Sequence, residues 1–266
     1  MKQRKTILIT GGAQGQGRAD ALKFAQNGFD IILGDVLDPS HEAFRSTISE
    51  LEALGAEVLA RKCDVTSLLE VDALFDAAWQ KFGRLDVVIA NAGIMTFGKI
   101  WELEERDVLR MLDINLTGAW RTNRAAALYM MKQGFGRIIN ISSTAGLKAS
   151  VNLGHYSMAK FGVIGLTKTL AKEVAGKGIT VNAICQTMVH SPMTERPAFI
   201  EYINKNSGTS FQTFEEMEAA LSKKRAMGVS FVEPEQVANL CYWVGASEEA
   251  GLITGAALPL DAGSLL

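Results

Sequence analysis

The stretch that decides the fold is Thr6-Ile-Leu-Ile-Thr-Gly-Gly-Ala-Gln-Gly-Gln-Gly17. It opens with an apolar, β-branched run, which is typical of a strand buried on both faces of a parallel sheet. The glycines that follow permit a tight turn, and residues 18–27 then place apolar side chains at helical spacing. A helix that begins behind such a turn offers unpaired N–H groups and the positive end of its dipole to a pyrophosphate. We therefore expect a nucleotide to bind through Gly11, Gln14, Gly15, Gln16 and Gly17, with a plain βα turn as the simpler alternative.

The same alternation of strand and helix continues along the chain. Strands are expected at residues 6–10, 30–34, 58–63, 87–90, 137–141, 180–184 and 256–260. Helices are expected at residues 18–27, 42–54, 68–82, 104–132, 156–175 and 234–246, with Ser40 and Ser67 as N-caps. This order predicts an α/β fold in one domain over residues 1–266, with a seven-stranded, doubly wound parallel sheet and helices on both faces.

Residues 186–232 interrupt this alternation. They contain helical pieces but no strand pattern, and aromatic side chains lie among the polar ones: Phe199, Tyr202, Phe211, Phe214 and Phe231. A segment of this length inside a domain is usually functional. We therefore expect a lid over a ligand site.

The composition argues against several classes of partner. The chain has 27 basic and 29 acidic residues, a net charge of −2, and no basic stripe, so nucleic acid is not expected as a partner. No apolar run approaches the ~20 residues that span a bilayer, and Thr6–Thr10 is too short for the core of a signal peptide, so we expect a cytoplasmic protein with no membrane segment. Cys63, Cys185 and Cys241 form no metal or disulfide pattern and are expected to be buried.

Polar residues follow the second, third and fourth predicted strands. Asp35 lies eighteen residues past Gly17, close to the spacing of an acid that binds the hydroxyls of an adenosine ribose. A carboxylate there would repel a 2′-phosphate, and Val36 brings no cation, so the sequence favours NAD over NADP. Strand ends meet at one edge of the sheet, where further cofactor contacts are expected from Asp64, Val65, Asn91, Ala92 and Gly93. A turn or N-cap role is the alternative for Asp64.

Tyr156 and Lys160 are one helical turn apart, so their side chains lie on the same face of a predicted helix. Alcohol oxidation and carbonyl reduction need a group that takes or gives a proton at oxygen, and a phenol can do so if its anion is stabilised. An ordinary tyrosine has a pKa of about 10, which a neighbouring lysine cation lowers. Ser143 follows the fifth strand and Asn115 lies in the long helix before it. Taken alone, the Tyr/Lys pair is more typical of an ordinary amphipathic helix.

As a set, these motifs resemble those of the short-chain dehydrogenase/reductase superfamily over essentially the whole chain. The matching motifs are Thr10-Gly-x-x-x-Gly-x-Gly17, Asp64, Asn91-Ala-Gly93, Asn115, Ile141-Ser-Ser143, Tyr156-x-x-x-Lys160, Ile253-Thr-Gly255 and Asp261-Ala-Gly263. The resemblance implies a Rossmann fold, oxidation of a CH–OH group with NAD as acceptor, and a homotetramer packed through the helices at 104–132 and 156–175.

The resemblance also implies roles for four residues. Tyr156 would be the acid/base catalyst, and Ser143 would orient and polarise the substrate oxygen. Lys160 would hold the nicotinamide ribose and lower the pKa of Tyr156. Asn115 would position a water in a proton relay.

After the sixth strand the chain departs from the family pattern. Gln186 and Thr187 replace a common Pro-Gly pair, although Val189 and Ser191 would still meet the nicotinamide carboxamide. Gly-Gln-Gly-Arg18 and Thr-Met-Val-His-Ser-Pro-Met193 are similar to a branch of carveol-type and mycofactocin-associated dehydrogenases. Most members of that branch carry an insertion after the second strand that this chain lacks.

The substrate pocket is expected above the nicotinamide, between Ser143, Tyr156 and the lid. Apolar or small residues are expected around it: Ile94, Met95, Ala145, Leu153, Met188 and Met193. Packing in the core is the alternative for about half of them. His155 and His190 stand beside these positions, where they either touch substrate or serve as ordinary structural histidines.

The sequence therefore predicts an NAD-dependent oxidoreductase that interconverts a small, largely apolar secondary alcohol and its ketone. Two alternatives stay open. A 3-oxoacyl-thioester reductase would prefer NADPH and basic residues near the pocket mouth, and Asp35 argues against it. A non-catalytic, NAD-binding redox sensor would have no need of Tyr156 and Lys160.

Overall fold

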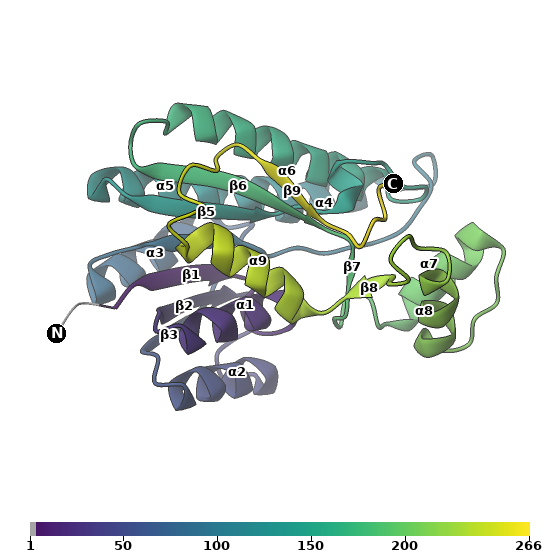
Figure 1. Ribbon diagram of the computed structural model, residues 1–266, viewed down its shortest axis with the longest axis horizontal. Coiled ribbons are helices and arrows are strands. Elements are labelled where there is room, and N and C mark those ends of the chain that lie inside the picture. The colour runs from purple at the N-terminus through teal and green to yellow at the C-terminus, as the bar shows by residue number, and fades with distance from the viewer. Residues whose placement is uncertain (1–3) are drawn as a thin grey trace.

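The computed structural model describes residues 4–266 and places a seven-stranded parallel sheet at the centre of the molecule (Figure 1). The strand order is β3-β2-β1-β4-β5-β6-β9, and every neighbouring pair is parallel. The strands are β1 (Thr6–Thr10), β2 (Asp30–Asp35), β3 (Val58–Lys62), β4 (Val87–Ala90), β5 (Gly136–Ile141), β6 (Ile179–Gln186) and β9 (Ala257–Leu260). The predicted α/β class and doubly wound sheet are confirmed.

Helices cover both faces of this sheet because its strands are apolar on both sides. One face carries α1 (Gly15–Gln26), α2 (Glu42–Ala53) and α9 (Pro234–Ala246). The other carries α3 (Leu68–Phe82), α5 (Gly118–Gln133) and α6 (Gly154–Glu173), with α4 (Glu105–Leu112) packed beside α6. Ile7 and Ile9 of β1 pack into the first layer and Leu8 into the second, so a single strand contributes to both cores.

The strand order reverses between β1 and β4, which are hydrogen-bonded neighbours. The loop after β1 and the loop after β4 therefore diverge to opposite faces and leave a crevice at the carboxyl edge of the sheet. In open α/β folds this switch point is where ligands bind.

The helix expected at residues 104–132 is present at residues 105–133, but it is not α-helical throughout. α4 runs into a π-helical turn at Asp113–Thr117, and α5 begins after it. A π turn holds one more residue than an α turn, which widens the helix locally. Asn115 lies in this turn and is buried.

Residues 186–232, which we call the lid segment, contain more structure than their sequence indicates. They form β7 (Met188–Val189), α7 (Pro197–Ser207), α8 (Phe214–Ser222) and β8 (Phe231–Val232), and β7 pairs with β8. Figure 1 shows α7 and α8 beyond one end of the sheet, joined to the rest of the chain through these two short strands.

One of the two predicted N-caps is wrong. Ser67 caps α3, since its hydroxyl accepts from the N–H of Glu70. The N-cap of α2 is His41, whose Nδ1 accepts from the N–H of Ala43, whereas the Ser40 hydroxyl donates to Asp38. The carboxylate of Asp38 competes for the serine and keeps it out of the helix cap.

Two further expectations from the sequence concern the cysteines and membrane-spanning segments. The three cysteines are buried free thiols, as expected. None of the helices within residues 4–266 is both long and apolar enough to cross a membrane.

Candidate active site

A cavity of about 1390 Å³ runs along the carboxyl edge of the sheet, from Asp35 at one end to the lid segment at the other. Ligand pockets usually measure about 300–1,000 Å³, so this cavity has room for a dinucleotide and a second small molecule. Most of the predicted cofactor residues line it: Gly11, Gln14, Gly15, Gln16, Asp35, Asp64, Val65, Asn91, Ala92, Gly93, Tyr156, Lys160, Val189 and Ser191. All the predicted substrate residues line it too: Ser143, Ala145, Leu153, Tyr156, Met188 and Met193.

The glycine-rich turn has the shape that close approach of a pyrophosphate requires. Gly11 and Gly15 have φ of 69° and 57°, a region that other residues rarely adopt. Gly15 is also the first residue of α1, so the unpaired N–H groups of the helix face the cavity. These features fit a dinucleotide.

Gly17, which we predict to contact the cofactor, does not line the cavity. A Cβ at this position would lie 2.1 Å from the carbonyl oxygen of Gly11 and 2.8 Å from Nδ2 of Asn91. The residue is glycine because the helix packs directly on the turn, and it supports the site from below.

Asp35 closes the other end of the turn. Its Oδ2 accepts from the N–H of Ala13 at 2.9 Å, and its Oδ1 accepts from the N–H of Leu37 at 3.0 Å. Because a carboxylate has about four lone-pair positions, both oxygens can still accept from ribose hydroxyls. These backbone bonds fix the carboxylate at the cavity wall.

Asn91 joins the two loops of the crevice. Its Nδ2 donates to the carbonyl oxygens of Thr10 and Gly11 at 3.0 and 2.9 Å, which ties the end of β4 to the glycine-rich turn. Asp64 accepts from the N–H and the hydroxyl of Thr66 at 2.9 and 2.8 Å. Asp64 therefore lines the cavity and also makes the turn contacts of its alternative role.

Tyr156 and Lys160 lie side by side on α6. Lys160 is buried, its Nζ donates to the carbonyl oxygen of Ile141 at 2.8 Å, and the same Nζ is 5.6 Å from the centroid of the Tyr156 ring. The lysine therefore stands beneath the phenol, held by the end of β5.

The expected lowering of the tyrosine pKa is not present in the protein alone. Burial raises the pKa of Tyr156 to about 12, and a hydrogen bond with Ser143 only partly opposes this. Burial also lowers the pKa of Lys160 to about 8. Desolvation of the phenolate dominates in the protein without cofactor, so the lowering of this pKa by Lys160 together with a bound nicotinamide stays a prediction.

Ser143 and Asn115 differ in their access to the cavity. Ser143 lines it, and its hydroxyl accepts from the N–H of Ala145 at 3.1 Å. Asn115 does not line it: its amide pairs with both backbone groups of Ile94, each at 2.8 Å. The side chain of Asn115 thus fixes the loop after β4.

The apolar part of the cavity wall lies between the loop before α6 and the lid segment, which includes β7. Sequence reasoning placed Phe199 and Tyr202 in the lid without assigning them to the wall that they line. It also missed Lys148 and Arg225, which line the cavity and whose side chains make no hydrogen bond or ion pair within residues 4–266. No periodicity distinguishes such a cation from any other surface residue.

The two histidines beside the predicted pocket do not line the cavity. His155 is buried, and its Nε2 lies 2.6 Å from the hydroxyl of Thr96. His190 faces carboxylates outside the cavity. Gln186, the residue that replaces proline, does line the cavity, and its Oε1 is buried without a hydrogen-bond partner in the described part of the chain.

Known proteins resemble this chain over nearly its full length. The family model for short chain dehydrogenase matches residues 5–198. The (−)-trans-carveol dehydrogenase of Rhodococcus erythropolis is 36% identical over 98% of both chains, and a 3-oxoacyl-acyl-carrier-protein reductase of Thermotoga maritima is 34% identical, also over 98% of both. The crystal structure of carveol dehydrogenase from Mycobacterium avium in complex with NAD has a TM-score of 0.92 at 32% identity, covering 99% of this chain and 98% of that one.

The matching proteins are all oxidoreductases, which is the class of protein that the fold and the site define. The chain belongs to the short-chain dehydrogenase family.

Proposed function

We propose that this protein interconverts a small, largely apolar secondary alcohol and its ketone, with NAD as the redox cofactor and Tyr156 as the acid/base. The observation that carries the proposal is the shared cavity. Ser143, Tyr156 and Lys160 line it next to an apolar wall that includes Leu153, Met188 and Met193.

The choice of NAD rests on Asp35. Its carboxylate is held at the end of β2 by two backbone N–H groups, where a 2′-phosphate would meet a fixed negative charge. Val36 follows it and lines the same cavity without bringing a cation. The relative crystallised with NAD has the same fold, which also favours this cofactor.

The protein's own residues handle the proton. Tyr156 is a neutral phenol at neutral pH, so it is ready to donate a proton to a ketone oxygen, and Ser143 stands beside it to orient that oxygen. NAD, when bound, supplies the nicotinamide carbon that exchanges hydride with the substrate, and its positive charge in the oxidised form favours the phenolate needed for alcohol oxidation. Lys160 lies where it can hold the nicotinamide ribose.

Replacing Tyr156 with phenylalanine tests this assignment. The Y156F variant keeps the ring and loses the hydroxyl, so turnover should fall by at least about 10²-fold while NADH binding stays within about twofold. NADH fluorescence titration measures binding and a spectrophotometric assay measures turnover. Turnover within tenfold of wild type would refute the role of Tyr156.

The substrate class needs its own experiment. The purified protein is assayed with NAD and NADP on a panel of cyclic and acyclic secondary alcohols, and its spectrum and mass are recorded to detect cofactor that co-purifies. Released NADH identifies an exchanging dehydrogenase. Tight NAD binding without turnover of any alcohol would favour the redox-sensor alternative.

A 3-oxoacyl-thioester reductase is the second candidate, and one observation favours it. Lys148 and Arg225 line the cavity, and their side chains have no polar partner among residues 4–266, as a site for an anionic thioester carrier requires. Reduction of a 3-oxoacyl thioester with NADPH at a higher kcat/KM than oxidation of any alcohol with NAD would select this function over the first.

A further inference from the structure

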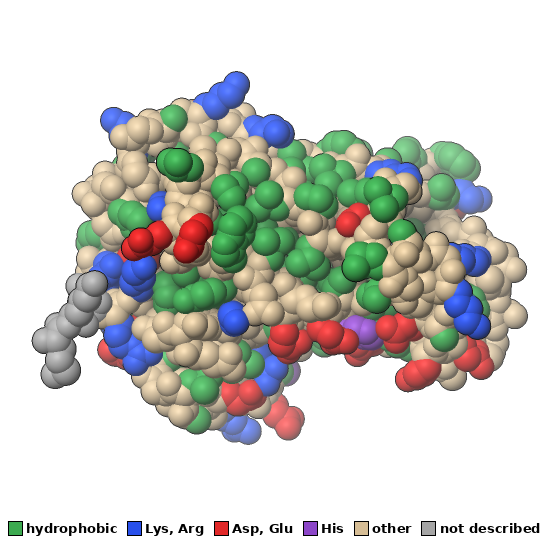
Figure 2. Space-filling model, in the orientation of Figure 1, with side chains coloured by type: hydrophobic (Ala, Val, Ile, Leu, Met, Phe, Trp, Pro, Cys, Tyr) green, Lys and Arg blue, Asp and Glu red, His purple; other side chains and the backbone are tan. Residues whose placement is uncertain are grey.

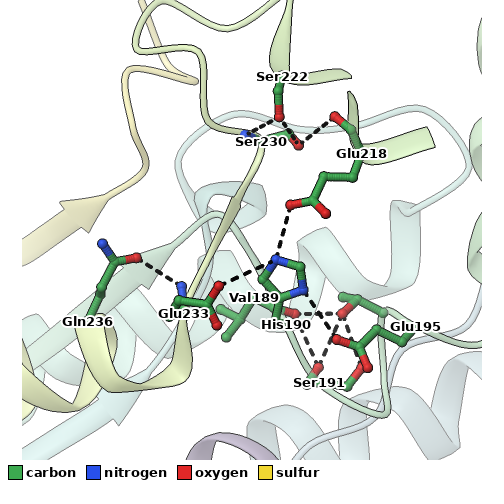
Figure 3. A network of polar contacts seen from close by, with 10 residues as sticks. Val189, His190, Ser191, Glu195, Glu218, Ser222, Ser230, Glu233 and Gln236 are labelled. Atoms are coloured by element: carbon green, nitrogen blue, oxygen red, sulfur yellow. Dashed lines mark hydrogen bonds and ion pairs between the residues drawn. The ribbon is translucent and has the colours of Figure 1, made fainter. Parts of the chain in front are cut away.

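His190 lies between two residues that line the cavity, yet its own side chain does not. Val189 and Ser191 are part of the cavity wall, and the His190 ring turns toward Glu195, Glu218 and Glu233 (Figure 3). Figure 2 shows a band of acidic side chains, with histidine colour among them, where the lid segment meets the rest of the molecule.

Both ring nitrogens of His190 face carboxylate oxygens. Nδ1 is 3.2 Å from Oε1 of Glu195, while Nε2 is 3.1 Å from Oε1 of Glu218 and 3.7 Å from Oε1 of Glu233. A carboxylate only accepts hydrogen bonds, and a neutral imidazole has one donor. The arrangement is therefore fully hydrogen-bonded only when both nitrogens carry a proton.

The groups around the ring come from segments far apart in the sequence. Glu195 follows β7, Glu218 lies on α8, and Glu233 is the N-cap of α9. The ring also packs against Phe214 of α8 and Phe231 of β8, with centroids 5.5 and 5.3 Å away. One side chain thus connects the lid helix α8 to the loop that follows β7.

The three glutamates have no other cation nearby. In the part of the chain that the structure describes, none of them forms an ion pair with a lysine or arginine. A protonated His190 is the one positive group among three negative ones. Without that charge the carboxylates repel one another across the junction between α8 and α9.

We propose that His190 is a positioning residue, whose contacts with the glutamates and aromatic rings hold α8 and thereby fix the Val189–Ser191 backbone against the nicotinamide end of the cavity. The proposal rests on the proposed function only for the identity of the cofactor. The clamp itself is a property of the protein without ligand.

The experiment compares wild type with His190→Leu and His190→Gln in the full chain. Trypsin cleavage at residues 223–225, directly after α8, reports how often the lid opens without ligand. We expect H190L to be cleaved about five to ten times faster and to bind NADH about three to ten times more weakly, with H190Q between it and wild type. The matched control is His41→Asn, which removes an exposed histidine but keeps a side chain that can cap α2, and it should change neither value by more than about twofold.

Hydrogen exchange of α8, corrected for the intrinsic rate, provides a second readout. Protection of α8 should be lower in H190L than in wild type. If H190L does not fold, Glu218→Gln and Glu195→Gln must each shift cleavage in the same direction by smaller factors.

The outcomes separate the two proposals. Unchanged cleavage and unchanged NADH affinity in H190L would overturn the clamp, and faster cleavage with unchanged affinity would overturn its positioning role. Failure of wild type to bind NADH would instead count against the proposed function, and the cleavage and exchange results would still decide whether His190 clamps α8.

Discussion

Asp20 is a buried acid that the proposed chemistry does not use. It lies on α1 below the glycine-rich turn, its Oδ1 accepts from Nε2 of Gln16 at 3.1 Å, and its Oδ2 is buried without a hydrogen-bond partner in the described chain. Burial raises the pKa of Asp20 from 3.8 to about 7, despite hydrogen bonds with Gln16 and Cys241. The folded protein therefore binds this proton more tightly than the unfolded chain does.

This pKa predicts how stability changes with pH. Between about pH 4 and pH 7 the folded state holds more of this proton than the unfolded state, so Asp20 makes folding less favourable as pH rises, and its full penalty is present above about pH 7. Asp20→Asn should therefore increase the free energy of unfolding by about 2 kcal/mol at pH 8 and by much less at pH 4.5. Urea unfolding at both values measures this, with exposed Glu52→Gln as the control. An equal effect of D20N at both pH values would contradict the prediction.

At the scale of elements, the π turn at Asp113–Thr117 sets the loop after β4. It presents Asn115 so that its amide pairs with both the N–H and the carbonyl of Ile94. The side chain is buried, so removing it leaves two backbone groups unpaired away from water. The Asn115 side chain thus supplies the hydrogen bonds that these two backbone groups of Ile94 need.

Asn115→Ala should lower the free energy of unfolding by about 3 kcal/mol, since each unpaired buried group costs about 1–3 kcal/mol. Denaturant unfolding measures the change. The control is Asn27→Ala, which removes an exposed amide that donates to the carbonyl of Lys23 and should cost less than about 1 kcal/mol. Equal losses in the two variants would show that Asn115 does not anchor the loop.

The sequence predicted long elements well and short or irregular ones poorly. The seven sheet strands agree with the prediction within about two residues because most of them contain a run of β-branched and other apolar residues. The π turn was missed because residues 105–117 contain no proline or glycine that would mark an irregular turn. One extra residue in the turn only shifts the spacing of the apolar side chains. β7 and β8 have two residues each, too few to show an alternation.

The sequence predicted those residues of the cavity wall that belong to recognisable motifs. Asp35, Ser143 and Tyr156 line it as expected, since each follows a strand or begins a helix at one sheet edge. Lys148 reaches the cavity from the loop before α6, Arg225 from the lid segment, and Ser264 and Leu265 from the last residues of the sequence. Such contacts depend on tertiary packing, which local spacing does not encode.

On the scale of the whole molecule, the outer surface of α5 and α6 has the character of an interface. Large apolar side chains that are 43–55% exposed share it: Trp120, Leu128, Met131, Met158 and Phe161. On α5 these side chains are spaced by eight and three residues, and on α6 by three, which keeps each set on one helix face. Gly165 of α6 has open space beside it, so a second backbone can approach closely. We expect these helices to pair with those of other copies in a homotetramer.

The combined change Trp120→Glu and Phe161→Glu should break that assembly into smaller species, because it places charges at the centre of a surface that must lose its water to associate. Light scattering coupled to size exclusion measures the mass, and circular dichroism confirms that the variant is folded. Leu54→Glu is the matched control, since Leu54 is a 41% exposed apolar residue at the end of α2, on the opposite face of the sheet. A tetrameric double variant would place the interface elsewhere, and a monomeric wild type would exclude the homotetramer. Loss of assembly in the double variant alone would assign the contact to α5 and α6.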